Sequence, residues 1–381
     1  DLVRYQNVRS ASFEGWKEDG SGVLIRTRFA DVDQLHRVDA PGGARRQLTY
    51  YGEPVGSVAS QPKGDKILFT RDAGGSEFAQ IFVLDPATGG ATMLTDGESR
   101  NGAVVWDREG RRMAYQSTAR NGASNDVWLM DPENPETAEI IVASDDGTWW
   151  GPAEFSAKGN RLLATNYVSI TDSRVHLVDL DSGSVTLLAG GPDNVSTNYP
   201  VAFDDGNDGY WLITSQGSEF QRLAWQPAEP GADVEVVTGD IEWDVSGAVI
   251  SRDRKRMAFA VNENGRSAIY LLDPRTREYR LVHNIPTGVA GRMEFSPDGQ
   301  KLAMTLNTAT SPSDTFVLET GPRALDYGAL TRWTFSEVGG LDTSTFREPG
   351  LISYPAFDTV GGQPREIPAV SYTHLRAHET S

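Results

Sequence analysis

The sequence of 381 residues contains no cysteine, so it has no disulfide framework, no thiolate metal site and no thiol nucleophile. It also lacks any run of about eighteen apolar residues, the length that a membrane-spanning helix requires. Helical periodicity is absent over every long window. The chain begins at Asp1, without a methionine or a signal-peptide pattern, which indicates either processing or a fragment of a longer protein.

Positive charge is also scarce. The chain has 35 basic against 53 acidic residues, a formal net charge of −18. Proteins that neutralise phosphate groups need the opposite sign, so nucleic acid and anionic membranes are excluded as partners. No cofactor motif and no cluster of metal ligands is found, so we expect neither a cofactor nor a metal.

One unit recurs along the whole chain. Its clearest copy, Phe295 to Met304, reads as a strand, a Pro-Asp-Gly turn and a second strand. About twenty residues further on, an apolar strand ends in a polar residue and a turn. This second landmark recurs at steps of 46, 46, 48, 47, 47 and 46 residues, at Asp39, Asp85, Asp131, Asp179, Gln226, Asp273 and Glu319. A repeat of this length with four short strands is typical of a β-propeller blade.

The fold class is therefore all-β. Seven landmarks predict a seven-bladed β-propeller of four-stranded antiparallel blades, as in TolB-like and WD40-like repeats, over residues 1–345. The strands are four to seven residues long, rich in Val, Ile, Leu, Phe and Trp, and separated by Gly, Pro and Asp. The Asp-Gly pairs supply the positive φ that tight hairpin turns need.

We label the strands of each blade A to D from the centre outward. The A–B and C–D turns then share one face of the propeller (the A–B face). The B–C loops and the crossings between blades share the other face (the B–C face). The A–B turns are short and plain, whereas the B–C loops read as long and irregular, at 71–78, 118–125, 166–173, 215–220, 262–266 and 307–314. Irregular loops that carry aromatic residues on a rigid scaffold indicate a binding surface.

Nine residues of the B–C face are candidates for contact with a substrate or a partner domain: Arg71, Glu77, Phe78, Arg120, Trp149, Trp150, Glu219, Phe220 and Trp243. The arginines are suited to a carboxylate, or else they tie neighbouring blades together. The two glutamates, each within Ser-Glu-Phe, are suited to a peptide α-amino group. Alternatively, they accept backbone hydrogen bonds or pair with arginines. The aromatic residues either bind a partner or cap the blade interfaces.

From Ser10 to Ala369 the chain resembles the prolyl oligopeptidase family of serine peptidases, in particular its bacterial acylaminoacyl-peptidase and dipeptidyl-aminopeptidase-like members. The resemblance depends on the order and spacing of five segments, RTRFADVDQLHRVDAPGG, RDAGGSEFAQIFVLD, STARNGASNDVWLMDP, SPSDTFVLE with LTRWTFSEVGGLD, and LISYPAFD followed by IPA. It implies a propeller that covers an α/β-hydrolase domain and filters short peptide substrates by size. Export signals of related members favour the periplasm or secretion, with the cytoplasm left open.

The catalytic residues of such a peptidase are not found in this sequence. A nucleophile elbow, Gly-x-Ser-x-Gly, is missing, and the nearest match, at 74–78, ends in Phe. No Glu-Glu pair occurs, which the resemblance would require for gripping a peptide amine. We therefore assign no catalytic residue. Residues 346–370 are expected to be a linker and the first hairpin of a truncated α/β-hydrolase domain.

Residues 371–381 do not continue that pattern and are expected to be a non-native tail. His374 and His378 are spaced as a helical metal pair but lack a third ligand. The parent protein is expected to be a serine peptidase and this chain to be inactive alone. The competing hypothesis is a TolB-like propeller that binds a protein partner and has no enzymatic activity.

Overall fold

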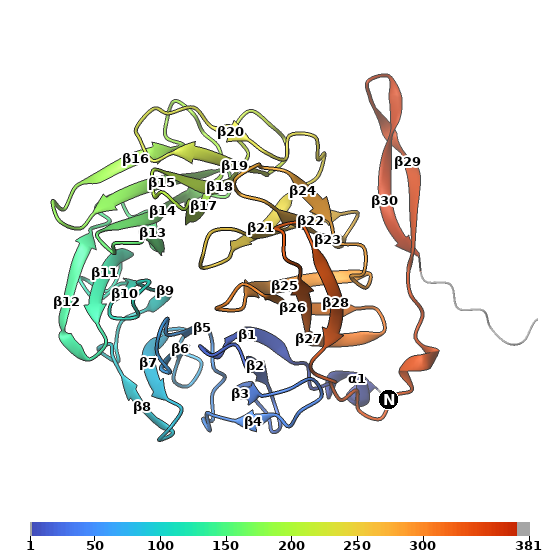
Figure 1. Ribbon diagram of the computed structural model, residues 1–381, viewed down its shortest axis with the longest axis horizontal. Coiled ribbons are helices and arrows are strands. Elements are labelled where there is room, and N and C mark those ends of the chain that lie inside the picture. The colour runs from blue at the N-terminus through green and yellow to red at the C-terminus, as the bar shows by residue number, and fades with distance from the viewer. Residues whose placement is uncertain (1, 372–381) are drawn as a thin grey trace, which may run out of the picture.

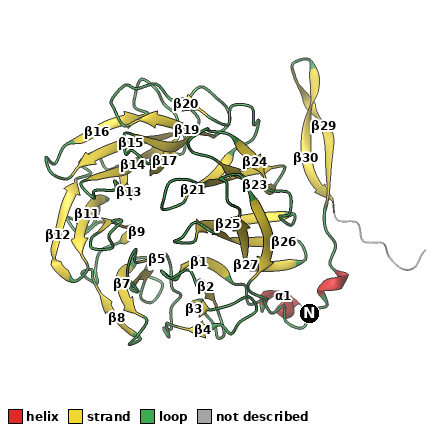
Figure 2. Cartoon of the chain, viewed as in Figure 1, coloured by secondary structure: helices red, strands yellow, loops and turns green. Residues whose placement is uncertain are grey.

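The computed structural model describes residues 2–371. The expected tail and its two histidines lie outside the described residues, apart from Ser371. The chain forms a ring of seven four-stranded antiparallel sheets around a central axis, as the repeat predicted (Figures 1 and 2). Each sheet contains four consecutive strands, so no blade borrows a strand from another part of the chain.

The strands of the first four blades are β1 to β16: β1 Ser12–Trp16, β2 Val23–Thr27, β3 Gln34–Val38 and β4 Arg46–Gln47; β5 Val58–Ser60, β6 Ile67–Arg71, β7 Gln80–Asp85 and β8 Gly90–Met93; β9 Asn101–Trp106, β10 Met113–Ser117, β11 Asp126–Asp131 and β12 Asn134–Val142; β13 Trp149–Phe155, β14 Arg161–Ser169, β15 Asp172–Asp179 and β16 Val185–Ala189.

The strands of the last three blades are β17 to β28: β17 Asn198–Phe203, β18 Gly209–Thr214, β19 Arg222–Pro227 and β20 Glu235–Val236; β21 Val245–Ile250, β22 Met257–Glu263, β23 Arg266–Leu272 and β24 Tyr279–Leu281; β25 Gly288–Phe295, β26 Lys301–Thr308, β27 Ser311–Thr320 and β28 Tyr327–Arg332.

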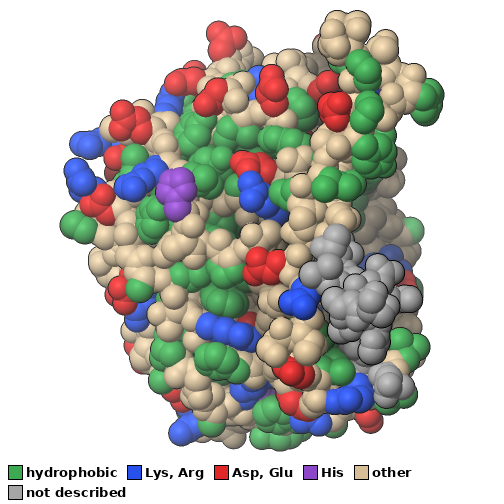
Figure 3. Space-filling model, turned by 90° about the vertical axis from the view of Figure 1, so that its right-hand side faces the viewer, with side chains coloured by type: hydrophobic (Ala, Val, Ile, Leu, Met, Phe, Trp, Pro, Cys, Tyr) green, Lys and Arg blue, Asp and Glu red, His purple; other side chains and the backbone are tan. Residues whose placement is uncertain are grey.

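Two short helices and one hairpin complete the described chain: α1 Leu2–Gln6, η1 Thr343–Thr345, and the hairpin of β29 Gly350–Val360 and β30 Gln363–Ser371. The hairpin turns at two glycines with positive φ, Gly361 and Gly362. It stands out from the propeller and exposes hydrophobic side chains (Figures 1 and 3). The expected hairpin is thus present, while its assignment to an α/β-hydrolase domain stays a prediction. None of the described helices is long and apolar enough to span a membrane.

The A–B turns follow the sequence closely. In blade 7 the N–H of Gly299 bonds to the carbonyl of Ser296 over 2.8 Å, and Gly299 has a φ of +68°. Blade 6 has no glycine there, and Arg254 adopts the same conformation with a φ of +61°. Left-handed backbone is strained for a residue with a side chain, so blade 6 keeps its turn at a local cost.

The B–C loops are only partly as expected. They are long in blades 2, 3 and 5, where residues 72–79, 118–125 and 215–221 lie outside the strands. The prediction of long loops is wrong for blades 4, 6 and 7, whose central strands continue into two-residue turns, at 170–171, 264–265 and 309–310. The reason is that polar residues there continue the ladder, for example Asn166 opposite Arg174.

Buried residues between neighbouring blades form the core. The junction of blades 7 and 1 closes the ring without a shared strand, through a cluster that includes Phe13, Trp16, Ala303, Val317 and Trp333. The rings of Trp16 and Trp333 meet edge-to-face with centroids 6.2 Å apart. The N–H of Ala11 bonds to the carbonyl of Ser313 over 2.8 Å. Side-chain packing and single backbone hydrogen bonds therefore hold this junction together, in place of a shared strand.

Candidate functional site

Buried polar side chains at the start of strand C hold the B–C face rigid. The Gln34 amide donates to the carbonyls of Tyr51 and Glu53 over 3.2 and 2.9 Å. The Gln80 amide donates to the carbonyl of Ser99 over 2.6 Å. In each case a side chain of one blade fixes the crossing that leads to the next. Paired in this way, buried polar groups stabilise one arrangement of the loops.

Arg71, at the end of β6, is engaged within the chain. Its Nη1 lies 3.0 Å from Oε2 of Glu53, in the crossing from blade 1. Its guanidinium also covers the rings of Tyr51 and Phe82, with centroid distances of 4.3 and 5.0 Å. Such contacts support the role in tying blades together, which the sequence left as one of two alternatives.

Arg120, in the B–C loop of blade 3, is bound more tightly still. It pairs with both carboxylate oxygens of the fully buried Asp126 over 2.8 and 3.0 Å. It also bonds Asp145 over 2.9 Å and the Ser144 carbonyl over 2.8 Å, both in the crossing to blade 4. These carboxylates raise the pKa of the guanidinium above its ordinary value. Arg120 therefore fastens its loop to the next blade.

Glu77 and Glu219 are both exposed, on loops of blades 2 and 5, which are not neighbours in the ring. Neither carboxylate has a hydrogen bond or ion pair among the described residues. The expected alternative partners are occupied: Arg71 bonds Glu53, and Arg222 bonds the Gln216 carbonyl over 2.8 Å. The two glutamates therefore remain available for a ligand, but from separate parts of the face.

The aromatic candidates divide into exposed and packed residues. Phe78 is exposed, with the Arg100 guanidinium 5.3 Å from the centroid of its ring, and Phe220 is half-buried. Trp150 and Trp243 pack onto the hydrophobic cores of blade interfaces. Trp149 is half-buried, and its ring lies over Gly151, where a Cβ would come within 2.1 Å. For Trp150 and Trp243, the contacts support the capping alternative.

The B–C face carries a set of exposed apolar side chains, of which sequence reasoning found only Phe78. Ile170, in the B–C turn of blade 4, is 81% exposed, and Phe335, just after β28, is 61% exposed. No exposed large hydrophobic residue lies in an A–B or C–D turn within residues 2–371. The members of this set, which we call the apolar ring, are Phe29, Tyr50, Phe78, Ile170, Val195, Val289 and Phe335. Single hydrophobic residues in loops or at the ends of strands give no periodic signal, which is why the sequence did not reveal the other six.

Ion pairs link non-adjacent blades on the A–B face. Arg254 of blade 6 pairs with Glu154 of blade 4. The same carboxylate accepts a hydrogen bond over 2.7 Å from the N–H of Phe203 in blade 5, the blade between those two. Arg252 of blade 6 pairs with Glu18 of blade 1 over 2.7 Å. Both pairs join blades that are not adjacent, so they tie the ring together on this face.

No group of three or more His, Asp or Glu side chains that could hold a metal ion occurs in the described part of the chain. The three strand histidines lie apart, in β3, in β15 and after β24. His36 is fully buried, His176 is half-buried and His283 is exposed.

Comparison with known proteins places the fold. The sequence matches no family profile and no curated protein. The structure is similar to one from a study of two prolyl endopeptidases, with a TM-score of 0.76 and 13% identity over 96% of this chain and 55% of that one. It is also similar to prolyl oligopeptidase B of Galerina marginata, with a TM-score of 0.73 and 12% identity over 96% of this chain and 56% of that one.

The chain thus spans just over half of the length of these solved structures. The part of it that is described consists of a seven-bladed propeller and one hairpin. The chain therefore has the fold of the β-propeller portion of prolyl oligopeptidases.

Proposed function

We propose that the chain is the substrate-gating propeller of a serine peptidase of the prolyl oligopeptidase type, and that its B–C face docks onto the catalytic domain. The apolar ring is the observation that carries the proposal. Exposed apolar side chains that occur in the loops and crossings of one face, and in none of the described turns of the other, favour a protein interface on that face. Residues 333–349 leave the propeller on the same face and continue into the apolar hairpin of β29 and β30.

In this arrangement the catalytic triad and oxyanion hole belong to the docked domain, and the propeller excludes large substrates from the space between the two. The ion pairs of Arg254 and Arg252 link non-adjacent blades on the opposite face, which favours entry of peptides between the domains. One similar structure, prolyl oligopeptidase B of Galerina marginata, was solved with a 35-residue substrate. Short peptides are the substrates that we propose for the whole enzyme.

The test begins with the reading frame that follows Ile367 in the source gene. We expect it to encode an α/β-hydrolase domain with a Gly-x-Ser-x-Gly elbow. That domain, expressed separately, should bind the propeller and hydrolyse peptide nitroanilides with a size limit that disappears when the propeller is omitted. A frame that ends without such a domain would overturn the proposal and favour a protein-binding scaffold.

Substitutions on the B–C face sharpen the test. Ile170→Asp combined with Phe335→Asp should weaken binding to the hydrolase domain by about tenfold or more, because the charge would be buried at the interface. The control is Val185→Asp, an exposed apolar residue of β16 that lies outside the apolar ring. Equal affinity for both variants in a binding titration would contradict the docking face.

A further inference from the structure

The N-terminal segment lies against the segment that follows blade 7, on the B–C face (Figure 1). The first of these, residues 2–9, contains α1 and leads into β1, and the second leads from β28 to the hairpin. The two are 335 residues apart in the sequence at Arg4 and Gly339, yet the Arg4 side chain bonds the carbonyl of Gly339. The two ends of the propeller therefore meet in a structure that no blade contains.

Blade 1 holds the N-terminal segment in place. Nη2 of Arg28, just after β2, donates to the carbonyls of Gln6 and Val8 over 2.7 and 3.2 Å. Nη1 of Arg45, just before β4, donates to the carbonyl of Arg9 over 3.2 Å. Hydrogen bonds from a charged donor are stronger than those between neutral groups. The segment is thus fastened to blade 1 along its second half.

Blade 7 holds only the beginning of the segment that follows it. The carboxylate of Asp314, in β27, is fully buried and accepts from the Thr334 hydroxyl over 2.6 Å. It also accepts from the hydroxyl and the N–H of Ser336 over 2.7 and 3.2 Å. From residue 337 to residue 340, each hydrogen bond to another segment of the described chain comes from the N-terminal segment. Control of the path therefore passes from blade 7 to the N-terminus after Ser336.

The contacts between the two segments follow one another along the chain. The N–H of Arg9 donates to the Glu337 carbonyl over 2.9 Å, and their side chains form an exposed ion pair at 3.5 Å. Nε of Arg4 donates to the Gly339 carbonyl over 3.0 Å, and its Nη2 donates to the carbonyl of Gly340. Gly339 has a φ of +64°, and a Cβ there would lie 2.6 Å from the Arg4 carbonyl oxygen. Such a close approach requires glycine.

The contacts with the propeller end after Gly340. The N–H of Leu341 bonds the carbonyl of Val338, and η1 is capped by its own Asp342. In the described chain, residues 341–349 have no hydrogen bond or ion pair to the propeller. The connection can therefore change direction within these nine residues without breaking a hydrogen bond to a blade.

We propose that residues 2–9 act as a strap that holds residues 337–340 beside blade 1 and so shortens the tether between the propeller and the hairpin. With the strap in place the tether is residues 341–349, and without it the tether is residues 337–349. The fully extended reach then changes from about 30 Å to about 44 Å. A longer tether lowers the effective concentration of whatever it carries, here by about twofold. The consequence for docking rests on the proposed function, whereas the strap itself is a property of this chain.

Spin labels test the strap directly, because the chain has no cysteine and a single introduced one reports a single position. Glu337→Cys places a label where the strap holds the connection and removes only an exposed ion pair, which contributes little. Arg347→Cys places a second label in the tether. We expect the label at 337 to be immobile and the label at 347 to be mobile. In a chain that starts at Arg9, the label at 337 should become mobile, and the label at 347 should not change.

Point variants test the same contact from both sides. Arg4→Ala removes the side-chain bonds of the strap, and Gly339→Ala pushes the connection away from it. Each should raise the rate at which a glutamate-specific protease cuts after Glu337 by about fivefold or more, because cleavage follows the population of the released form. Cleavage after Glu219, in an exposed loop of blade 5, is the internal standard. The control is Arg275→Ala, an exposed arginine in the C–D turn of blade 6.

Two results would overturn the proposal. One is a label at 337 that is equally mobile with and without residues 2–8. The other is cleavage after Glu337 that is no faster in Arg4→Ala and Gly339→Ala than in Arg275→Ala. Circular dichroism checks that each variant keeps the propeller. All of these measurements use this chain alone, so the absence of a hydrolase domain in the source gene would leave the strap unaffected.

Discussion

At the scale of single residues, the B–C face depends on buried ion pairs. Asp126 is fully buried and its carboxylate accepts three hydrogen bonds, two from Arg120 and one from the Ser144 N–H. Removing one partner of a buried pair leaves the other charge unmatched. Arg120 is therefore a structural residue, although the sequence equally allowed a ligand-binding role.

We expect Arg120→Ala to lower the free energy of unfolding by about 3 kcal/mol, because Asp126 would remain buried without its cation. Urea denaturation of the variant measures the change. Lys158→Ala, an exposed lysine, serves as the control and should change stability by less than about 0.5 kcal/mol. An Arg120 variant as stable as wild type would show that the ion pair contributes nothing.

His176 should make the stability depend on pH. Its ring packs on Trp150 with centroids 4.5 Å apart, and burial, with a further contribution from Arg174, lowers its pKa to about 4. The unfolded chain has the ordinary value near 6.5 and takes up a proton first as the pH falls. The stabilising contribution of the neutral ring is complete above pH 6.5 and is lost progressively towards pH 4.

The expected loss of unfolding free energy from this residue is up to about 3 kcal/mol between those values. Denaturation at a series of pH values should show how steeply the free energy of unfolding falls with pH. The substitution His176→Gln should make this fall less steep. Some slope would remain, because burial also lowers the pKa of His36. A slope unchanged by the substitution would assign the pH dependence to other groups.

At the scale of elements, blade 6 carries a strained turn. Arg254 takes the left-handed conformation that Gly299 takes in blade 7, and it also pairs with Glu154. Arg254→Ala loses the pair and keeps the strain, whereas Arg254→Gly loses the pair and relieves the strain. We therefore expect the Gly variant to be more stable than the Ala variant by about 1 kcal/mol in thermal unfolding. The reverse order would mean that the turn changes conformation.

Strand positions and A–B turns were predictable because they depend on local chemistry. Short apolar runs mark most of the strands, and a glycine marks every A–B turn except that of blade 6. The lengths of the B–C loops were not predictable. Asn166 and Tyr167 read as loop residues, yet they pair with Arg174 and Ser173 because the neighbouring strand offers free hydrogen-bonding groups. Pairing of this kind is decided by the partner strand and not by local propensity.

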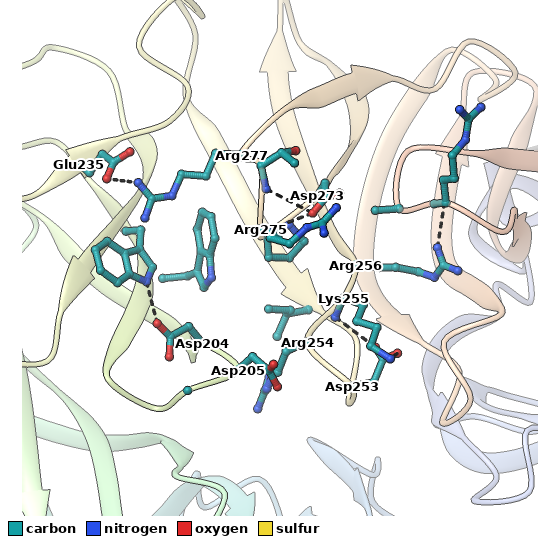
Figure 4. Close-up of a pocket in the computed structure, with 18 of the residues that line it drawn as sticks. Asp204, Asp205, Glu235, Asp253, Arg254, Lys255, Arg256, Asp273, Arg275 and Arg277 are labelled. Atoms are coloured by element: carbon teal, nitrogen blue, oxygen red, sulfur yellow. Dashed lines mark hydrogen bonds and ion pairs between the residues drawn. The ribbon is translucent and has the colours of Figure 1, made fainter.

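At the scale of the whole molecule, the number of blades and the fold class followed from the repeat, whereas the candidate sites did not. Sequence reasoning predicted a binding surface on the B–C face because its loops are irregular. It predicted no site at the A–B turns because they are short. The A–B face also has a pocket, which is lined by turns of three blades that lie far apart in the sequence (Figure 4). Only the ring brings Asp205, Arg275 and Arg323 to one place.

The junction of blades 7 and 1 should be the part of the ring that opens most easily. A crossing of the chain joins each of the other neighbouring pairs of blades, whereas none joins these two. We expect Trp333→Ala to lower the unfolding free energy by about 3 to 5 kcal/mol and to increase proteolysis within blades 1 and 7. The control, Leu212→Ala in the buried strand β18, should destabilise the protein without directing cleavage to that junction. Equal cleavage patterns in the two variants would contradict a weak junction.

The self-contained blades have a consequence for the order of the sequence. Arg9 and Glu337 form a backbone bridge, with the Arg9 N–H bonded to the Glu337 carbonyl over 2.9 Å. A short peptide linker could therefore join the two ends of the propeller, and new termini could be placed between any other two neighbouring blades. Such circular permutants should reach the same ring from a different starting residue, since position around the axis is set by side-chain fit and not by order of synthesis.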